Sequence, residues 1–215
     1  DAAAGTVTVN PGMEELEAFA DRERLEREKR ERLAALAQLP AVTLSGRRIM
    51  MMANVGSPGE VAAAAAAGAD GIGLFRSEFL YLGRDTLPDE EEQLAASRKA
   101  LDSIPGKPVI VRPLDIGADK TTPALPMPHE ENPALGIRGV RFSLKNTGIF
   151  RTQLRALCRA SAFGDLRVML PMVVSADEGR RARCCARCRT SCALRNIPLT
   201  PPCRSALCLK LPPPH

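Results

Sequence analysis

Short apolar runs that end at or near an arginine, separated by stretches of helical character, constrain the fold of this chain more than any other feature. The run Gly71 to Phe75 is followed at once by Arg76, and the run Pro108 to Leu114 contains Arg112 close to its end. Runs of this length and content are typical of buried strands in a parallel sheet. The sequence therefore predicts two strands that each place an arginine at the same rim of a sheet.

The sequence from Gly46 onward repeats this alternation of strand and helix. It predicts further strands ending near Asn54 and over Leu166 to Val174. The intervening helices are predicted from Pro58 to a stop at Gly68, from Asp89 to Ser103 and from about Ile149 to Ser161. Such alternation implies right-handed crossovers and a parallel sheet, so the predicted fold class is α/β. If the sheet closes as a (β/α)8 barrel, all strand C-termini face one rim, where such barrels bind their substrate.

The first 45 residues do not follow this alternation. Thr6 to Val9 alternates like a short strand, which Asn10 and Pro11 would end. Met13 to Gln38 is dense in strong helix formers and in acidic and basic residues three or four positions apart, which predicts one long helix. Its apolar stripe is thin in the middle, so the helix is either a lever or spacer between two domains or a surface helix packed only at its ends. Leu39 to Ser45 is predicted to be a linker.

The basic charge of the chain is concentrated in residues 184–215, called the tail below. The tail holds five of the 30 lysine and arginine residues and none of the 25 acidic residues, so residues 1–183 are balanced in charge despite the net charge of +5. Basic residues of the long helix are interleaved with glutamate, which argues against a nucleic-acid partner. No signal peptide is visible, and no apolar run approaches the roughly 18 residues of a membrane span, so no membrane partner is predicted.

Cysteine is distributed just as unevenly. Cys158 is the only cysteine before the tail, and six more lie within it. A single cysteine in the body of the chain suits a reducing compartment, which predicts a cytoplasmic protein. Cys185 with Cys188 and Cys203 with Cys208 form two pairs that could hold a zinc ion. The alternative function is therefore a non-catalytic binding module that uses the long helix or a zinc-binding, cysteine-rich tail.

Three arginines are predicted to meet at the rim of the sheet. Arg76 and Arg112 close two strands, and Arg138 follows in the segment ENPALGIRGVRFSL. Guanidinium groups there could form bidentate hydrogen bonds to a phosphate and a carboxylate, a geometry that lysine does not match. The alternative is that the arginines form purely structural ion pairs with nearby carboxylates. Those carboxylates are Glu78, Asp115 and Asp119.

Six segments carry a resemblance to a known family. They are TVTVNP, ANVGSPGE, GADGIGLFRSEFLYLGRDTLPDEEEQ, KPVIVRPLDIGADK, ENPALGIRGVRFSL and FRTQLRALCRASAFGDLRVMLPMV. In order and spacing they resemble enzyme I of the bacterial phosphoenolpyruvate-dependent sugar phosphotransferase system. The resemblance covers about residues 5 to 180 and suits multiphosphoryl transfer proteins, which contain an enzyme I module, equally well. The related barrels of pyruvate phosphate dikinase and phosphoenolpyruvate synthase are less similar.

The resemblance implies a phosphoryl-transfer reaction. In that family a C-terminal barrel binds phosphoenolpyruvate and magnesium, and a histidine in a separate N-terminal domain takes the phosphoryl group and passes it to the carrier HPr. The family's substrate-binding arginines fall on Arg76, Arg112 and Arg138. Residues in matching rim segments are expected to support them. These are Asn54, Glu78, Asp115, Asp119 and Lys120. The full-length protein is expected to be a homodimer, as the barrels of the family are.

The resemblance places the catalytic and metal-binding residues of the family outside this chain. The phosphoryl-accepting histidine belongs to a TSH segment upstream of Asp1, and the chain is expected to lack its true N-terminus because it does not start with Met. The magnesium-binding glutamate and aspartate, and the cysteine of a GMCGE motif, would follow the point where the chain departs from the pattern. His129 lies in a polar loop and His215 at the chain end. We therefore expect no catalytic or metal-binding residue here and no activity of the chain alone.

The resemblance also divides the chain into parts. Residues 1–12 would end the phosphohistidine domain, 13–45 form the linker helix and linker, 46–183 form the N-terminal half of the phosphoenolpyruvate-binding barrel, and 184–215 lie outside the family pattern. Four of the eight barrel strands then fall within the chain. A half barrel exposes two strand edges and apolar inner faces, so we expect the isolated chain to aggregate or to pack loosely.

The tail has the signature of a frame error. If each codon is reread from its third base, every cysteine codon, which begins TG, becomes one for Leu, Met or Val. CCARCRTSCA is then compatible with the amphipathic helix LLREVQDELR, and TPPCRSALCLK with a string such as PAVPVGIMLE. The second string resembles the family's next strand, (I/V)PVGIMVE. The sequence thus predicts a one-base frame error near Gly179 to Arg183.

Overall fold

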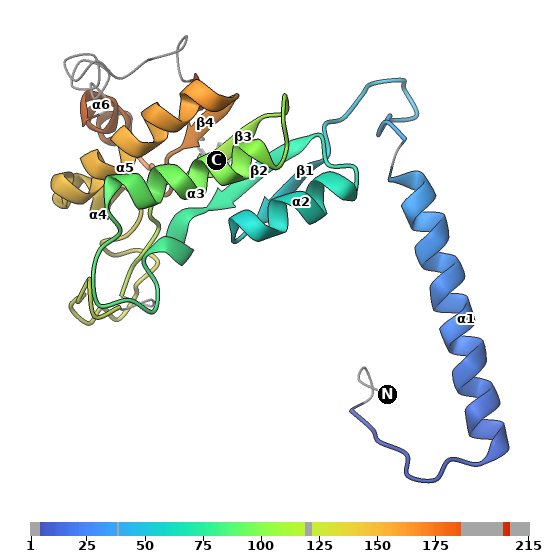
Figure 1. Cartoon of the computed structure of the whole chain (residues 1–215). Helices are drawn as coiled ribbons and strands as arrows, with labels where there is room; N and C mark the ends of the chain where they lie inside the picture. The colour runs from blue at the N-terminus through green and yellow to red at the C-terminus, as the bar shows by residue number, and fades with distance from the viewer. Residues whose placement is uncertain (1–4, 38, 119–121, 186–203, 207–215) are drawn as a thin grey trace.

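A parallel sheet of five strands forms the centre of the computed structural model, which describes residues 5–37, 39–118, 122–185 and 204–206. The strand order is β1-β2-β3-β4-β5, so strands that follow one another along the chain also lie side by side. Figure 1 shows the first four of them. The strands are β1 (Met52–Val55), β2 (Gly71–Arg76), β3 (Val109–Arg112), β4 (Leu166–Met169) and β5 (Arg204–Ala206). This sheet confirms the predicted α/β class.

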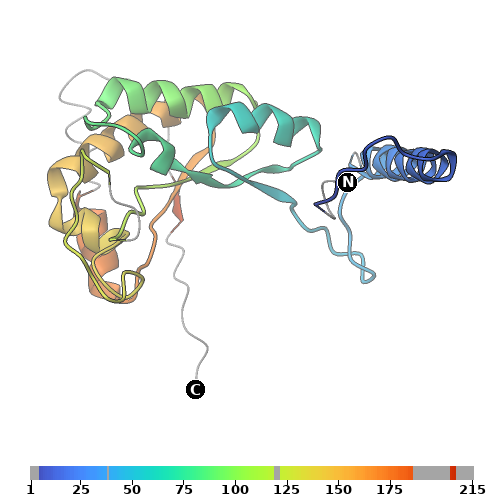
Figure 2. The ribbon, with the colours of Figure 1, turned by 90° about the horizontal axis from the view of Figure 1, so that it is seen from below.

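Helices connect the strands, and three of them match the predicted ones. These three are α2 (Pro58–Ala66), α3 (Glu90–Asp102) and α5 (Thr147–Ala160). Shorter elements are η1 (Ser77–Leu80), α4 (Val140–Lys145), η2 (Ser161–Phe163) and α6 (Ala176–Cys185). α3 contacts both α2 and α5, and Figure 2 shows α2 and α3 along one face of the sheet. No helix in the described part of the chain is long and apolar enough to cross a membrane.

The residues at the helix ends explain where the helices begin and end. The Asp89 carboxylate accepts a hydrogen bond from the Glu92 N–H at 2.8 Å, which caps the start of α3. Pro58 occupies the first turn of α2, where its missing N–H costs no hydrogen bond. Beyond α2, Gly68 adopts φ +86°, and a Cβ there would lie 1.9 Å from the carbonyl oxygen of Ala37. Only glycine fits this turn.

Two strands are shorter than their apolar runs, and proline explains why. The predicted strand Pro108 to Leu114 is β3, which ends at Arg112 because Pro113 has no N–H for the next ladder bond. The predicted strand Leu166 to Val174 is β4, which ends at Met169, before Pro171 and before Met172, whose φ is +60°. Both predictions were therefore right in place but too long at their C-terminal ends.

The core lies between the sheet and the covering helices. Strand residues contribute β-branched and aromatic side chains, and the helices contribute leucines and small residues. Its buried members include Val55, Val61, Ile72, Phe75, Ala100, Val109, Val111, Phe150, Leu157, Ala160 and Leu166. Burial of this apolar surface is the main favourable term in folding.

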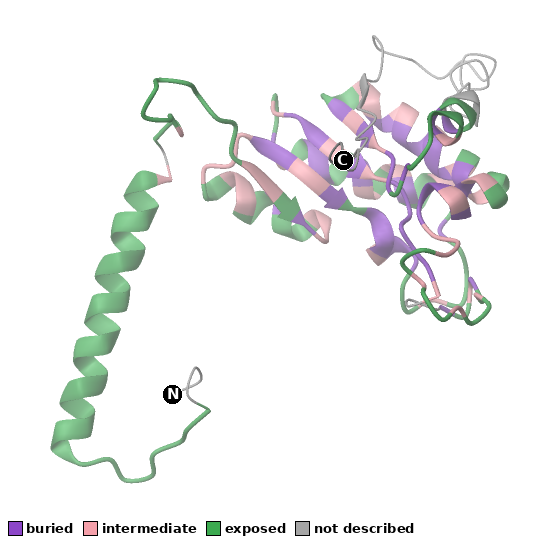
Figure 3. Cartoon of the chain, turned by 180° about the vertical axis from the view of Figure 1, so that it is seen from behind, coloured by how far each residue is buried: buried purple, intermediate pink, exposed green. Residues whose placement is uncertain are grey.

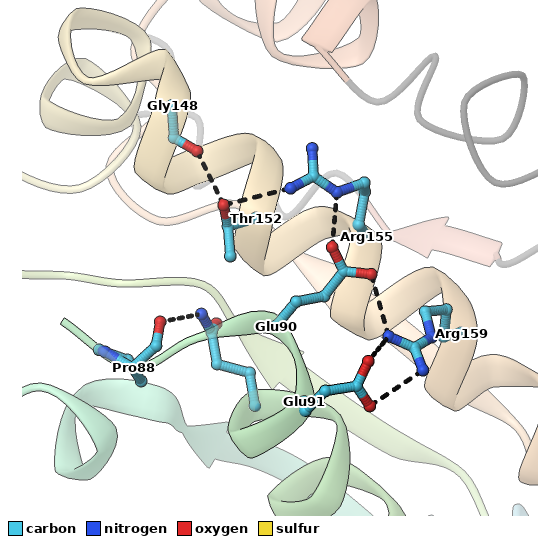
Figure 4. Close-up of polar contacts among 8 residues, drawn as sticks. Pro88, Glu90, Glu91, Gly148, Thr152, Arg155 and Arg159 are labelled. Carbon is cyan, nitrogen blue, oxygen red and sulfur yellow. Dashed lines mark hydrogen bonds and ion pairs between the residues drawn. The ribbon is translucent and has the colours of Figure 1, made fainter. Parts of the chain in front are cut away.

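Two glutamates on α3 and two arginines on α5 fasten these helices together, and we call this group the helix clamp (Figure 4). Glu90 Oε2 pairs with Arg155 Nε at 2.7 Å, and Glu90 Oε1 with Arg159 Nη1 at 3.1 Å. Glu91 Oε2 accepts from Arg159 Nη2 at 3.0 Å. Burial acts to raise the pKa of Glu90, but the hydrogen bonds from Arg155 and Arg159 outweigh it and hold that pKa below its ordinary value.

The long predicted helix is confirmed as α1 (Met13–Leu36), and its residues are exposed along its whole length (Figure 3). Pairs of opposite charge three positions apart, such as Asp21 with Arg24 at 2.9 Å, run along its surface. The C-terminal end of α1 approaches the body of the protein, where Ala37 meets Gly68. The division of the chain into residues 1–12, 13–45, 46–183 and 184–215 stays a prediction.

The predicted strand Thr6 to Val9 is wrong. The residues are irregular, and Val7 and Val9 are 89% and 78% exposed. A strand needs a neighbour to satisfy its N–H and C=O groups, and no described segment lies beside this one.

The tail contributes one strand to the sheet. β5 pairs in parallel with β4, matching Arg167 with Arg204 and Met169 with Ala206. The prediction of four strands is therefore wrong. A strand forms where its backbone groups pair with a neighbour, and such pairing does not require alternating apolar residues. Residues 186–203 and 207–215 lie outside the described residues. The side chains of the proposed zinc pairs, Cys185 with Cys188 and Cys203 with Cys208, are likewise not described, so the zinc site and the frame error stay predictions.

Candidate functional site

Arg76 and Arg112 lie next to each other at the C-terminal ends of two paired strands. In the register of β2 and β3, Arg76 is the direct partner of Arg112. Parallel strands end at the same rim, and an arginine directly follows the apolar part of each run. The structure therefore confirms that the sequence brings these two arginines to one place.

Arg112 is held by two carboxylates and is largely buried. Its Nη2 contacts Glu78 Oε1, and its Nη1 lies 3.3 Å from Asp115 Oδ2. The side chains of Arg112 and Glu78 are 19% and 6% exposed. Arg112 Nε and Glu78 Oε2 are nevertheless buried without a hydrogen-bond partner among the described residues. Arg112 Nε can therefore donate to a further acceptor, whereas Glu78 Oε2 could only accept from a further donor.

Arg138 joins Arg112 through a shared carboxylate. Arg138 Nε lies 3.3 Å from Asp115 Oδ1, so Asp115 bridges the two guanidinium groups. The backbone just after Arg138 is bonded to the segment that follows β4, because the Val140 N–H donates to the Pro171 carbonyl at 3.0 Å. We call Glu78, Arg112, Asp115 and Arg138 the rim cluster.

The loop that leads to Arg138 is closed by a glutamate. The Ile137 N–H donates to both carboxylate oxygens of Glu130, at 3.1 and 3.2 Å. A Cβ on Gly136 would lie 1.7 Å from Glu130 Oε2, so only glycine leaves room for this closure. The loop therefore has a defined conformation where Arg138 enters the rim cluster.

Arg76 is the exposed arginine of the three. Its guanidinium lies against Gly56 in the β1–α2 loop, where a Cβ would come within 2.7 Å of Arg76 Nη2. It forms no ion pair or side-chain hydrogen bond with the residues that the structure describes. Nearby, the pKa of Glu60 is lowered by the Gly56 N–H, by the Ser57 hydroxyl and, more weakly, by the positive charge of Arg76. Arg76 is thus free to turn toward a ligand at the rim.

Two residues of the rim were missed in the sequence, Ser77 and Gln153. Ser77 is 2% exposed, and its hydroxyl donates to the Arg112 carbonyl at 2.7 Å. Gln153, also 2% exposed, donates to Ser77 Oγ at 3.1 Å. A signal was available for Gln153, because it lies on the same helical face as Phe150, Leu154 and Leu157, where a polar residue needs a partner.

The remaining predicted residues are placed less closely. Asn54 lies in β1 and is exposed, and His129 lies exposed in a loop. Asp119 and Lys120 lie outside the described residues. Of the carboxylates predicted to pair with the arginines, Glu78 and Asp115 do so, and the prediction for Asp119 is not tested.

Comparison with known proteins identifies the family. The profile of a family described as "PEP-utilising enzyme, PEP-binding domain" matches residues 30–202, where PEP is phosphoenolpyruvate. The chain belongs to this family of PEP-utilising enzymes. The chain is 47% identical over 184 residues to phosphoenolpyruvate-protein phosphotransferases of Bacillus sp. (strain S) and Geobacillus stearothermophilus. The corresponding protein of Staphylococcus carnosus (strain TM300) is 45% identical over the same length.

These alignments confirm the resemblance to enzyme I and set its extent. They cover 85% of this chain but 32% of each relative. The chain thus spans about a third of the length of the curated relatives it matches. The PEP-binding family is thus shown for this chain, whereas the activity of a whole phosphotransferase stays a proposal.

The described part of this PEP-binding domain presents no cluster for a metal ion. No group of three or more His, Cys, Asp or Glu residues among the described residues is placed to hold one. Glu78 and Asp115 are already engaged with arginine. Magnesium stays an expectation from the family resemblance.

The ion pairs at the rim leave some guanidinium groups available. The structural ion pairs that the alternative interpretation requires are present for Arg112, with Glu78 and Asp115, and for Arg138, with Asp115. Arg76 forms no ion pair with the described residues and lies near Glu60, and Arg112 Nε has no hydrogen-bond partner among the described residues. These available N–H groups suit an anionic ligand.

Proposed function

We propose that this chain is the phosphoenolpyruvate-binding part of a phosphoenolpyruvate-protein phosphotransferase, and that Arg76, Arg112 and Arg138 bind the substrate. The observation that carries the proposal is that Arg76 pairs in register with Arg112 while Arg112 and Arg138 converge on Asp115. Support also comes from the names of the relatives, which are phosphoenolpyruvate-protein phosphotransferases.

The chemistry of the substrate suits the rim. Phosphoenolpyruvate carries a phosphate and a carboxylate, and each can accept two parallel hydrogen bonds from one guanidinium. A phosphate oxygen could satisfy the buried Arg112 Nε, and Arg76 is available to bind the second anionic group. Fixed positive charge at this position would also stabilise the charge that develops as the phosphoryl group leaves the enol oxygen.

The rest of the reaction belongs to the whole protein. Following the family resemblance, the phosphoryl group would move to a histidine of a separate domain and then to HPr, and the complete protein would be a cytoplasmic homodimer that uses magnesium. Asn54, Glu78, Asp115, Asp119 and Lys120 would support the arginines. No described residue is given a catalytic or metal-binding role, so we expect the chain alone to bind substrate without turning it over.

The sheet is proposed to be part of a (β/α)8 barrel. Strands in sequential order, all parallel, are what such a barrel requires, and the arginines lie at the C-terminal rim where barrels bind substrates. α1 is then the linker helix that precedes the barrel. The open edges of β1 and β5 would pair with strands that complete the barrel, which gives a physical reason for loose packing or aggregation of the isolated chain.

The proposal is tested by titrating the chain with phosphoenolpyruvate in an isothermal calorimeter. Arg112→Ala should weaken binding about 10- to 100-fold, because it removes charge-assisted hydrogen bonds to the anion. Arg167→Ala is the matched control: Arg167 lies on β4 and pairs with Asp165, at the end of the strand away from the rim. Equal affinities of Arg112→Ala and the parent chain, or equal losses in both variants, would contradict the proposal.

A further inference from the structure

A buried amide on α5 fixes the backbone that carries Arg112. Gln153 Oε1 accepts a hydrogen bond from the Leu114 N–H at 2.9 Å, and Gln153 Nε2 donates to Ser77 Oγ at 3.1 Å. The Ser77 hydroxyl in turn donates to the Arg112 carbonyl at 2.7 Å. One side chain thus connects a helix to both sides of the Arg112–Leu114 segment.

This segment begins at the last residue of β3 and leaves the sheet there. β3 ends at Arg112, and Pro113 has no N–H, so the ladder of sheet hydrogen bonds cannot continue. The Arg112 carbonyl and the Leu114 N–H are the groups that the Gln153 network holds. Asp115 follows directly, so the network bonds backbone groups on both sides of Pro113, between the rim residues Arg112 and Asp115.

The network needs an amide at position 153. The Leu114 N–H requires an acceptor, and Ser77 Oγ, whose proton is given to Arg112, requires a donor. Only a side chain with one donor and one acceptor side by side satisfies both groups. A buried group left unpaired here would lose its hydrogen bond without recovering water.

We propose that Gln153 is a positioning residue that fixes the Arg112 guanidinium and the Asp115 carboxylate for anion binding. This inference rests on the proposed binding of phosphoenolpyruvate at the rim. Gln153 acts from α5 through Ser77 and Leu114, and it does not touch the ligand. Loss of the amide lets the Arg112 segment move, and the rim arginines then no longer meet one anion in a single geometry.

Gln93 provides a matched control. It is also a glutamine that is 2% exposed, and it also lies on a helix that covers the sheet. Its Nε2 donates to the Pro88 carbonyl at 3.1 Å, and its Oε1 accepts from the Tyr81 hydroxyl at 3.1 Å. Gln93 therefore makes the same number of side-chain hydrogen bonds as Gln153, but none to the Arg112 segment.

The test compares Gln153→Leu with Gln93→Leu in the whole chain. Both variants should lower the free energy of unfolding, since each leaves buried polar groups unpaired. Only Gln153→Leu should weaken phosphoenolpyruvate binding, by about ten-fold. In ligand-free samples labelled with nitrogen-15, the Arg112 guanidinium signals should show hindered rotation in the parent chain and in Gln93→Leu, and free rotation in Gln153→Leu.

A third variant tests whether the effect of Gln153→Leu comes from the lost hydrogen bonds or only from misfolding. In Gln153→Glu the neutral carboxylic acid has the donor and acceptor of the amide, whereas the carboxylate lacks the donor. The hindered rotation of Arg112 should therefore return as the pH is lowered and the buried acid is protonated. Gln153→Leu should show no such recovery.

The outcomes separate this inference from the function on which it rests. Unchanged Arg112 signals in both Gln153 variants, or equal changes in Gln93→Leu, would overturn the positioning role. Failure of Arg112→Ala to weaken binding would overturn the proposed substrate site instead. The guanidinium signals of the ligand-free chain still decide the role of Gln153 in that case.

Discussion

The rim cluster and the helix clamp are built from the same two kinds of side chain, but they are completed differently. In the clamp, two glutamates face two arginines, and both oxygens of Glu90 have arginine partners. In the rim cluster, two arginines likewise face two carboxylates, but Arg112 Nε and Glu78 Oε2 are buried without hydrogen-bond partners among the described residues. The charges balance in both clusters, and the difference is that the rim cluster keeps a buried guanidinium N–H that can still bind an anion.

The largest expected difference concerns the loss of one carboxylate from each cluster. Asp115→Asn should lower the free energy of unfolding by about 3 kcal/mol, because two largely buried guanidinium groups lose the charge that they share. Glu90→Gln should cost about 1 kcal/mol, because Arg159 keeps Glu91. Urea unfolding of both variants measures the two losses.

Phosphoenolpyruvate should distinguish these two variants further. An anion at the rim replaces part of the missing negative charge, so it should raise the melting temperature of Asp115→Asn more than that of Glu90→Gln. If the ligand stabilises both variants equally, the contrast between a ligand-binding cluster and a structural one is lost.

A smaller effect is expected from Gly56, which leaves room for the exposed guanidinium of Arg76. Gly56→Ala places a Cβ within 2.7 Å of Arg76 Nη2 and displaces this flexible side chain at little cost in stability. Binding of phosphoenolpyruvate should weaken several-fold while the melting temperature stays the same. Gly59→Ala is the control, since its Cβ would have no neighbour closer than 3.9 Å. Parent-like binding by Gly56→Ala would remove Arg76 from the site.

The smallest effect is the pH dependence of the clamp. The pKa of Glu90 lies below its ordinary value in the folded protein, so its contribution to stability is complete above that ordinary value. The contribution is lost as the pH falls through the lowered pKa. The difference in unfolding free energy between the parent chain and Glu90→Gln should therefore shrink on acidification, as measured by urea unfolding at a series of acidic pH values. A difference that stays constant would show that the Glu90 charge does not stabilise the clamp.

The sequence predicted the rim where a local pattern was sufficient. Arg76 and Arg112 follow apolar runs, and the parallel sheet then brings strand ends together. The bridge from Arg138 to Asp115 depends on how a long loop folds back onto β4, which no periodicity encodes. Gln153 and Ser77 were missed for the same reason, because they meet across 76 positions of the sequence.

The errors in the fold have a related cause. Thr6 to Val9 has strand-like alternation but no neighbour among the described residues, whereas β5 has a neighbour but no alternation. Backbone pairing decides whether a strand forms, and side-chain pattern is only a guide to it. Proline at positions 113 and 171 explains why the apolar runs outlast the strands.

The most direct test of the central claim follows all the arginine guanidinium signals of the nitrogen-15-labelled chain while phosphoenolpyruvate is added. One anion site predicts that Arg76, Arg112 and Arg138 respond together with a single midpoint, while Arg155 and Arg159 of the clamp stay unchanged. Separate midpoints for the three rim arginines, or an equal response from the clamp, would contradict the account.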